Sequence, residues 1–322
     1  LLRRCNPQSI ADDPIRALRA VRQSVQLGLR IEPATLHDIR ANAAALSNIS
    51  PERVRDELFN LLSLAKPASA MRIVDAAGLL PYIMPGYTGL TTLRSHDADA
   101  WTRRVTMIER VADVLTVIGP GRSDNTTASF GLGMIAIQLA PYRSRLLEHV
   151  ETTWANERPH RALLILAALL QELTGIEEAA EALRLSNQES QRLAIIAKGS
   201  LPSEELLPLV IHRFWRKTGA AGIDLCLLTL AQHLADVGAE FDQAKWLLMI
   251  ERVRVLLEAY YERYTQLIEP PVLINGAQLM KALNLKPGPI VGKLLEAIRE
   301  AQVTGEVRSA EDALALARTH LA

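Results

Sequence analysis

The helical character of this chain is already evident in residues 12–28, DDPIRALRAVRQSVQLG. An acidic pair followed by Pro14 is a helix start signal, and Gly28 is a typical helix end. The apolar positions of this stretch fall on one helical stripe: Ile15, Leu18, Val21 and Val25. Asp13 and Arg16, three residues apart, lie together on the opposite face. The stretch therefore predicts an amphipathic helix with a charged outer face.

The same pattern continues along the chain. Leucine and alanine recur at helical spacing, and aromatic residues make up only 4% of the sequence, which argues against strands. Start and stop signals predict further helices at about residues 35–46, 51–66, 68–77, 97–118, 126–139, 141–153, 159–173, 176–183, 187–197, 202–217, 220–237 and 242–268, then a helical tail over 275–321. We expect an all-α fold, an elongated multi-module helical array.

Proline- and glycine-rich stretches mark the predicted module boundaries. They lie near residues 81–89, 199–202 and 269–271. The expected modules are residues 1–90, 91–199, 200–268 and 269–322.

Length and composition exclude several classes of protein. The 322 residues carry 36 basic and 36 acidic side chains, so there is no global basic field. Hydrophobic content of 49% excludes a disordered chain, and no apolar run reaches the roughly 18–20 residues of a membrane span. Two distant cysteines form no disulfide framework. We expect a cytoplasmic protein with no membrane partner.

A local basic patch is hidden in this neutral average. Residues 1–30 contain six arginines and two aspartates. One interpretation is a solvated helix face, since most surface ion pairs contribute little. The other rests on Asp13 and Arg16, because an acceptor beside a planar fork of donors matches the Watson–Crick edge of a nucleobase.

Three segments carry a family resemblance. They are residues 10–22 (IADDPIRALRAVR), 27–35 (LGLRIEPAT) and 49–58 (ISPERVRDEL). Together they resemble the neck of bacterial class II tRNA nucleotidyltransferases and poly(A) polymerases, including the nucleotide-recognition motif D and the motif E of that family. The resemblance implies that Asp13 and Arg16 read the base of CTP or ATP. It implies supporting roles for Asp12, Arg19, Arg22, Glu52, Arg53 and Glu57.

Glu57 also has an explanation that needs no family. It lies at the edge of its helix's apolar stripe, and Arg22 lies at the edge of the stripe of the first helix. A partly buried charge needs a partner, so the two should meet where the helices pack. We therefore expect Glu57, with Glu52 and Arg53, to brace the base-reading helix and not to take part in catalysis.

The resemblance extends to the C-terminal module, over residues 270–280, 285–295 and 302–307. Pro287-Gly288-Pro289 is a helix start, and its free N–H groups with Lys286 and Lys293 nearby could hold an RNA phosphate. The candidate RNA-binding residues are Lys286, Gly288 and Lys293. The alternative is a helix–turn–helix packing corner.

A basic run with aromatic residues, residues 213–217 (RFWRK), offers a second possible RNA contact. Interleaved aromatics and arginines can stack on single-stranded RNA. The resemblance favours packing of these aromatic rings inside a helical body instead.

The middle of the chain departs from the family. Many members carry an HD-type phosphohydrolase domain there, whose His-Asp dyad follows an apolar helix and binds a divalent metal. Here Gln171-Glu172 replaces the dyad, and Arg103 fills the expected upstream ligand position. His96-Asp97 is the remaining His-Asp pair, and we expect the other histidines not to cluster: His37, His149, His160, His212, His233 and His320. We therefore predict a degenerate HD-like domain without a metal.

The catalytic residues of the family are not recognisable. Nucleotidyl transfer uses two carboxylates that hold Mg²⁺, and in the family they follow a Gly-Ser in an N-terminal head. The only Asp-x-Asp here is Asp97-Ala98-Asp99, in a helical region without that Gly-Ser. Since the chain also begins at Leu1 without Met, we expect a fragment that lacks the head and is inactive alone.

The resemblance implies the C-terminal part of a template-independent RNA 3′-end nucleotidyltransferase, either a CCA-adding tRNA nucleotidyltransferase or a poly(A) polymerase. Its substrates would be CTP and ATP, its partners tRNA or other RNA 3′ ends, and its Mg²⁺ would sit in the parent head. Two alternatives stay open: an HD-type metal-dependent phosphohydrolase, and a non-catalytic helical RNA-binding or interaction module.

Overall fold

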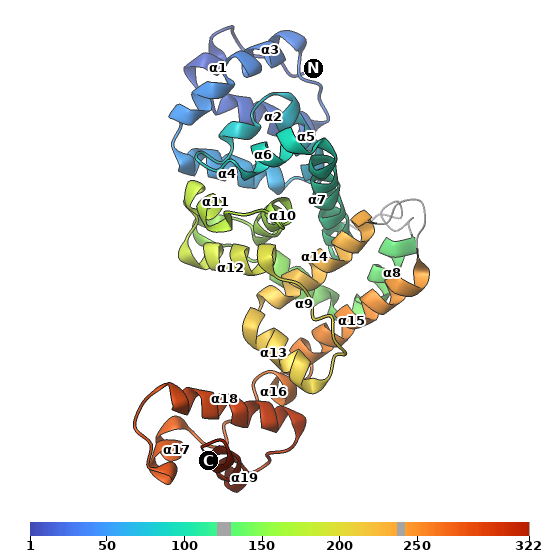
Figure 1. Cartoon of the computed structure of the whole chain (residues 1–322). Coiled ribbons are helices and arrows are strands. Elements are labelled where there is room, and N and C mark those ends of the chain that lie inside the picture. Colours follow the sequence, from blue (N-terminus) through green and yellow to red (C-terminus); the bar gives the residue numbers. More distant parts are fainter. Residues whose placement is uncertain (121–129, 237–241, 322) are drawn as a thin grey trace. The chain divides into compact units, whose positions relative to one another are not determined.

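A computed structural model describes residues 1–120, 130–236 and 242–321 (Figure 1). Within these ranges the chain is helical and contains no β-strand, only the isolated bridges Leu2–Ile31 and Thr153–Pro159. The all-α prediction is confirmed. None of the helices in the described ranges is long and apolar enough to span a membrane.

The chain divides into two compact units. Unit 1 comprises residues 1–200 and 223–247, and unit 2 comprises residues 201–222 and 248–322. The predicted 200–268 module thus contributes to both units, and the four-module division remains a prediction.

Unit 1 contains most of the helices. Its α-helices are α1 (Ser9–Asp12), α2 (Arg16–Leu27), α3 (Pro33–Ala41), α4 (Pro51–Leu62), α5 (Pro67–Ala76), α6 (Gly89–His96), α7 (Ala98–Ile118), α8 (Phe130–Gln138), α9 (Arg143–Val150), α10 (His160–Leu170), α11 (Ile176–Ala182), α12 (Asn187–Lys198) and most of α14 (Ala221–Asp236). Short 3₁₀ turns lie at η1 (Ala43–Asn48), η2 (Leu80–Tyr82), η3 (Ala140–Tyr142) and η4 (Ala155–Glu157). The predicted start of the 126–139 helix lies outside the described residues.

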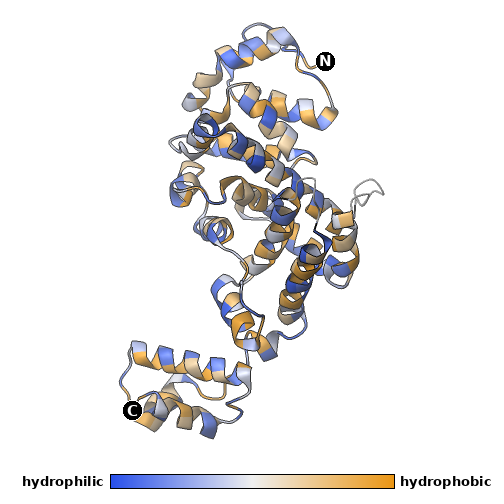
Figure 2. Cartoon of the chain, turned by 45° about the vertical axis from the view of Figure 1, so that its right-hand side comes forward, coloured by the Kyte–Doolittle hydropathy of each residue, from blue (hydrophilic) through white to orange (hydrophobic). Residues whose placement is uncertain are grey.

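The core of unit 1 is built around α10. Every residue from Ala162 to Leu170 is fully buried, as its uninterrupted apolar sequence requires. Helix α10 packs against α4, α7 and α12, while α2 packs against α4 and α5. Most other helices alternate hydrophobic and hydrophilic residues, as Figure 2 shows, because they bury one face only. Helix α4 therefore lies between the N-terminal helix α2 and the central helix α10.

The start of α2 differs from the prediction. The helix begins at Arg16, and Asp13 does not cap it. Asp13 instead has an extended backbone (φ −144°, ψ 89°) between α1 and α2. The reason is Pro14, whose ring disfavours the helical conformation for the residue before it. The predicted end is confirmed, since Gly28 closes α2 in the left-handed region (φ 63°).

Unit 2 contains α13 (Pro208–Thr218), most of α15 (Gln243–Tyr261), α16 (Tyr264–Leu267), α17 (Gly276–Leu283), α18 (Pro289–Thr304) and α19 (Ala310–Thr319). The last three helices share a small apolar core of their own. Helix α13 begins six residues later than the predicted 202. Residues Pro202, Ser203 and Glu204 stay irregular because their carbonyls accept hydrogen bonds from the Arg252 guanidinium (2.7, 3.3 and 2.7 Å).

Candidate functional site

Asp13 and Arg16 lie side by side where α1 meets α2. The Arg16 Nε is 3.6 Å from Asp13 Oδ2, and Arg16 Nη1 donates to the Ser9 carbonyl at 3.1 Å. The carbonyl of Asp13 accepts the Arg16 backbone N–H at 3.0 Å. This break between helices thus presents a carboxylate and a guanidinium together, as the spacing predicts.

Three arginines surround the Asp13 carboxylate. Arg53 of α4 donates to Oδ1 at 3.1 Å, while Arg16 Nε and Arg19 Nη1 lie 3.6 and 3.9 Å from Oδ2. The side chains of Arg16, Arg19 and Arg53 remain 49, 46 and 49% exposed. Three half-exposed cations around one carboxylate leave a surplus of positive charge and of free N–H donors. The site is suited to a ligand that is anionic and carries acceptor atoms.

Glu57 lies beneath this cluster. Its side chain is only 7% exposed; Arg22 Nε donates to Oε1 at 2.5 Å, and Arg19 Nε lies 3.7 Å from Oε2. A buried carboxylate with two cationic neighbours on α2 can hold α4 and α2 in register. Asp12 and Glu52, in contrast, are exposed and have no side-chain ion pair in the part of the chain that the structure describes.

In the tail, Lys286, Gly288 and Lys293 are exposed at the start of α18. The helix begins at Pro289 with Gly288 as its N-cap residue and without a side-chain cap, so the predicted helix start is confirmed. A Cβ at Gly292 would meet nothing within 4 Å, so this face of the helix start is open. Neither lysine has an ion pair within the described ranges.

The aromatic residues of α13 are inside the protein. Phe214 is 7% and Trp215 1% exposed, and the Trp215 ring lies 4.4 Å from that of Tyr260. Packing, as expected, accounts for them, and they are not available to stack on RNA.

The expectation that the remaining histidines do not cluster is wrong. His149 of α9 and His160 of α10 meet Asp224 of α14, with their Nε2 atoms 2.8 and 2.7 Å from Asp224 Oδ1. Arg192 of α12 donates to Oδ2 at 2.9 Å. No sequence spacing indicated this cluster, because Asp224 lies 75 and 64 residues from His149 and His160. Its local signal is Asp224 itself, an acidic residue in the first turn of a helix that is mostly apolar.

Asp224 is ionised. It is fully buried, and burial alone would raise its pKa, but the two imidazoles and their hydrogen bonds outweigh that and hold the pKa well below its usual range. Burial of the Cys226 thiol raises its pKa, and the nearby Asp224 carboxylate raises it further, so this thiol is unreactive.

The donor set of this cluster suits hydrogen bonds better than a metal. Trp154 Nε1, which can only donate, lies 3.1 Å from His160 Nδ1, so Nδ1 must be unprotonated. The neutral ring then carries its proton on Nε2, the atom that faces Asp224. A ring flip would place carbon atoms at both contacts. His160 therefore presents an N–H donor to Asp224, and not the lone pair that a metal needs.

The arginine that lies at the C-terminal end of α10 is not the predicted one. Arg103 is 67% exposed and pairs with Asp97 at 3.3 Å, so it does not fill a ligand position. The neighbouring Arg104, 12% exposed, lies beside the end of α10: it donates to the Ala168 carbonyl at 3.4 Å and lies 3.8 Å from the Glu172 carboxylate.

Beside this helix end is a cavity of about 510 Å³ whose lining includes His96, Asp97 and Glu172. Asp97 caps α7 through the Ala100 N–H, and His96 Nδ1 bonds the Thr92 carbonyl. Within the described ranges these side chains do not form a convergent group of three metal ligands. The phosphohydrolase alternative therefore has no ligand set here.

Two family models match the chain. Residues 28–90 match a model described as the probable RNA- and SrmB-binding site of polymerase A. Residues 243–317 match a model described as a putative tRNA nucleotidyltransferase domain 2.

Curated relatives match nearly the whole chain. A CC-adding tRNA nucleotidyltransferase of Geobacter sulfurreducens is 30% identical over 316 residues, covering 97% of this chain and 64% of the relative. An A-adding tRNA nucleotidyltransferase of Deinococcus radiodurans is 29% identical over 345 residues, 98% of this chain and 70% of the relative. The chain thus spans about two thirds of the length of these relatives.

Solved structures show the same fold. A CCA-adding enzyme in complex with ATP superposes with a TM-score of 0.56 at 16% identity, covering 98% of this chain and 62% of that one. A CCA-adding enzyme in complex with CTP gives a TM-score of 0.55 at 18% identity, covering 99% of this chain and 62% of that one.

Proposed function

Because the chain belongs to the family of tRNA nucleotidyltransferases and poly(A) polymerases, we propose that it selects the nucleotide and binds the RNA for template-independent nucleotidyl transfer to RNA 3′ ends. The observation that carries this proposal is the Asp13–Arg16 pair inside a positive cluster, with the Arg16 side chain 49% and the Asp13 side chain 25% exposed. The substrates are CTP and ATP, and the RNA is tRNA or another RNA 3′ end.

The chemistry of the pair explains the choice of base. Cytosine and adenine both present an amino donor beside a ring-nitrogen acceptor on the Watson–Crick edge. The Asp13 carboxylate accepts from the amino group, and the Arg16 guanidinium donates to the ring nitrogen. Uracil and guanine place a carbonyl oxygen where the amino group would be, and that oxygen meets the carboxylate as a repulsive pair of acceptors.

Arg53 does not block this role. A carboxylate offers about four lone-pair directions, so Asp13 can accept from Arg53 and from a base at once. Arg53 restrains the carboxylate, and the Arg22–Glu57 pair restrains the helix below it. Because these side chains are already restrained, less conformational entropy is lost when the nucleotide binds.

The transfer step needs groups that the described residues do not present. Two carboxylates that hold Mg²⁺ are required, and the Asp97-Ala98-Asp99 stretch does not fit them because Asp97 caps helix α7 and Asp99 lies in its first turn. We propose that the isolated chain binds nucleotide and RNA without transferring nucleotide.

Nucleotide selection is tested by titrating the chain with CTP, ATP, GTP and UTP in a calorimeter. We expect CTP and ATP to bind about tenfold more tightly than UTP, since one well-placed base contact is worth roughly 1–3 kcal/mol. Asp13→Asn should bring the ratio close to one, because an amide can also donate to the uracil oxygen. Arg72→Ala removes an exposed arginine paired with Glu109 and should change nothing. Equal binding of all four nucleotides by the unaltered chain would refute the proposal.

RNA binding by the tail is tested by titrating tRNA at several salt concentrations. Each neutralised phosphate contributes roughly 0.7–0.9 to the logarithmic salt slope, so the Lys286→Ala/Lys293→Ala double variant should lower that slope by about 1.5. Lys198→Ala, an exposed lysine paired with Glu177 in unit 1, is the matched control. An unchanged slope in the double variant would show that the tail lysines do not contact RNA.

A further inference from the structure

Helix α4 carries charges on two different faces. Arg53 and Glu57 are four residues apart and face α2, as their contacts with Asp13 and Arg22 show. Arg55 lies roughly 200° around the helix from Arg53, at about 100° per residue. It is buried, at 5% exposure, although it is charged. A buried guanidinium requires partners, and those of Arg55 lie on the side away from the nucleotide site.

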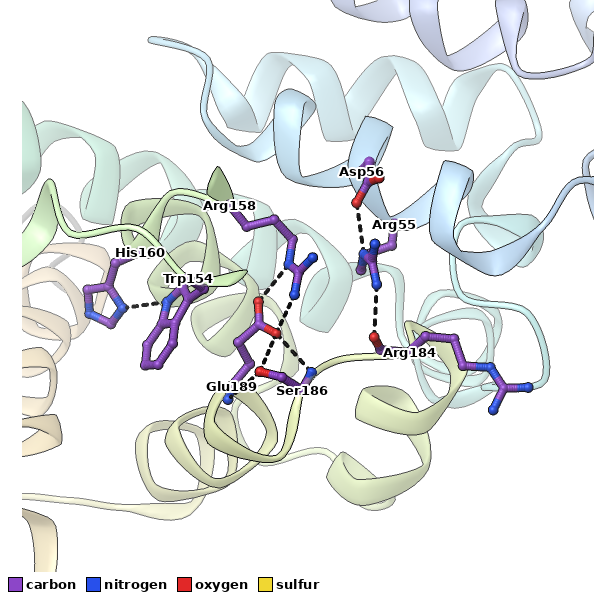
Figure 3. Close-up of polar contacts among 8 residues, drawn as sticks. All are labelled: Arg55, Asp56, Trp154, Arg158, His160, Arg184, Ser186 and Glu189. Carbon is purple, nitrogen blue, oxygen red and sulfur yellow. Dashed lines mark hydrogen bonds and ion pairs between the residues drawn. The ribbon is translucent and has the colours of Figure 1, made fainter. Parts of the chain in front are cut away.

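The partners of Arg55 are drawn in Figure 3. Its Nε donates to Asp56 Oδ1 at 2.8 Å, and its Nη1 donates to the backbone carbonyl of Arg184 at 2.8 Å. Arg184 belongs to the short connection between α11 and α12 and has a left-handed backbone (φ 47°). Arg55 thus ties α4 to a connection 129 residues further along the chain.

The connection between α11 and α12, which accepts the hydrogen bond from Arg55, is itself fixed by buried polar contacts. Ser186 and Glu189 form a capping box at the start of α12, and Arg158 grips Glu189 through two hydrogen bonds of 2.7 and 2.6 Å (Figure 3). Arg158 is 5% exposed and Glu189 fully buried. Burial would raise the pKa of Glu189, but the bonds from Arg158 and Ser186 outweigh it and hold the pKa below its usual range. This buried bidentate pair is a fixed support.

We propose that Arg55 is a positioning residue for base selection, which sets the placement of α4, and through Arg53 that of the Asp13 carboxylate, from the helical domain behind it. The inference rests on the proposed function of Asp13 and Arg16. The connection consists of two hydrogen bonds joined by helix α4. Arg55 donates to the Arg184 carbonyl (2.8 Å), and Arg53 on the same helix donates to Asp13 (3.1 Å). A displacement of about 1 Å can reduce the rate of an enzyme that depends on exact placement by about 10²-fold. Loss of the Arg55–Arg184 hydrogen bond should therefore alter base selectivity without removing any nucleotide contact.

The test uses the four-nucleotide titration and the variant Arg55→Met, which keeps the stem of the side chain and removes both hydrogen bonds. We expect the CTP-to-UTP affinity ratio to fall about threefold, from about ten to about three, the size of change that about 0.7 kcal/mol produces. Arg55→Lys keeps the charge, but its single ammonium group cannot reach both partners as the guanidinium fork does. Its CTP-to-UTP ratio should therefore lie between those of Arg55→Met and the unaltered chain. Arg184→Gly is the matched control, since it keeps the carbonyl and suits a positive φ.

The outcomes separate the two proposals. No selectivity in the unaltered chain refutes the proposed function and this inference with it. Selectivity in the unaltered chain that Arg55→Met leaves intact overturns this inference alone. A lower melting temperature with an unchanged ratio also overturns it, because that result shows a purely structural role. If Arg55→Met does not fold, Arg55→Lys is titrated in its place, and a ratio equal to that of the unaltered chain then overturns the inference.

Discussion

Replacement of Asp224 by asparagine is the strongest perturbation that the structure offers in unit 1. The carboxylate accepts three charge-assisted hydrogen bonds, from His149, His160 and Arg192. Asparagine has one acceptor oxygen and one NH₂ group. If its oxygen faces the histidines, its NH₂ meets the Arg192 donors; if it is turned, its NH₂ meets two imidazole N–H groups. One orientation loses one hydrogen bond and the other loses two.

The magnitude follows from the milder orientation. A hydrogen bond to a charged group is worth about 1.5–3 kcal/mol, and the two retained bonds are weakened because the acceptor is no longer charged. We expect Asp224→Asn to lower the free energy of unfolding by about 3 kcal/mol, at the lower end of the values found for broken buried ion pairs. For a domain of 150–250 residues this corresponds to a fall in Tm of about 6–12 °C.

The assay is urea and thermal unfolding followed by circular dichroism between pH 7 and pH 3. The folded pKa of Asp224 lies below the ordinary value of 3.8, so its stabilisation is complete above about pH 4 and is lost as the pH falls toward the folded pKa. The difference between the free energies of unfolding of the two proteins should therefore narrow below pH 4. Asp99→Asn, at an exposed aspartate, is the control. A difference under about 0.5 kcal/mol at pH 7, no larger than a surface substitution gives, refutes the reasoning.

Three further changes test other parts of unit 1. Trp154→Phe removes the donor to His160 Nδ1 and permits the other tautomer, so calorimetry should detect Zn²⁺ binding that the unaltered chain lacks; equal binding by both would contradict the tautomer assignment. Glu57→Gln should lower the free energy of unfolding by about 2 kcal/mol, measured in urea, because Arg22 loses a buried anionic partner; no change would exclude the brace. Gly28→Ala should cost about 1 kcal/mol in the same assay through its left-handed backbone alone, since an added Cβ meets no atom within 4 Å, and a neutral result would contradict this.

Local signals predicted the helices well where the chain supplies its own partners. Ser186 accepts the Glu189 N–H and so caps the helix that the sequence predicts from residue 187, and Pro51 and Pro289 begin helices at the positions that their fixed φ favours. The helix prediction was wrong at residues 202–207. The distant residue Arg252 donates hydrogen bonds to the carbonyls of residues 202–204, so these carbonyls have partners without forming a helix.

The candidate site was predictable to the extent that it is local. Asp13 and Arg16 are three residues apart, and the turn in which the Asp13 carbonyl accepts the Arg16 N–H keeps them close although Asp13 lies outside α2. The position of Glu57 followed from a charge at the edge of an apolar stripe. The Asp224 cluster was not predictable in this way, because four helices must first pack before its members meet, and no sequence spacing records that contact.

Arg55 shows where a sequence signal was present but unused. On the wheel of α4 it falls between Phe59 and Leu62, within the apolar arc, whereas Glu57 lies at the arc's edge. A charge at the edge can reach a neighbour and still contact water, but a charge within the arc must find a partner in the core. The sequence of α4 therefore requires a second packed surface, opposite α2, that supplies an acceptor. The Arg184 carbonyl is that acceptor, so the helix behind the proposed nucleotide site specifies its own support.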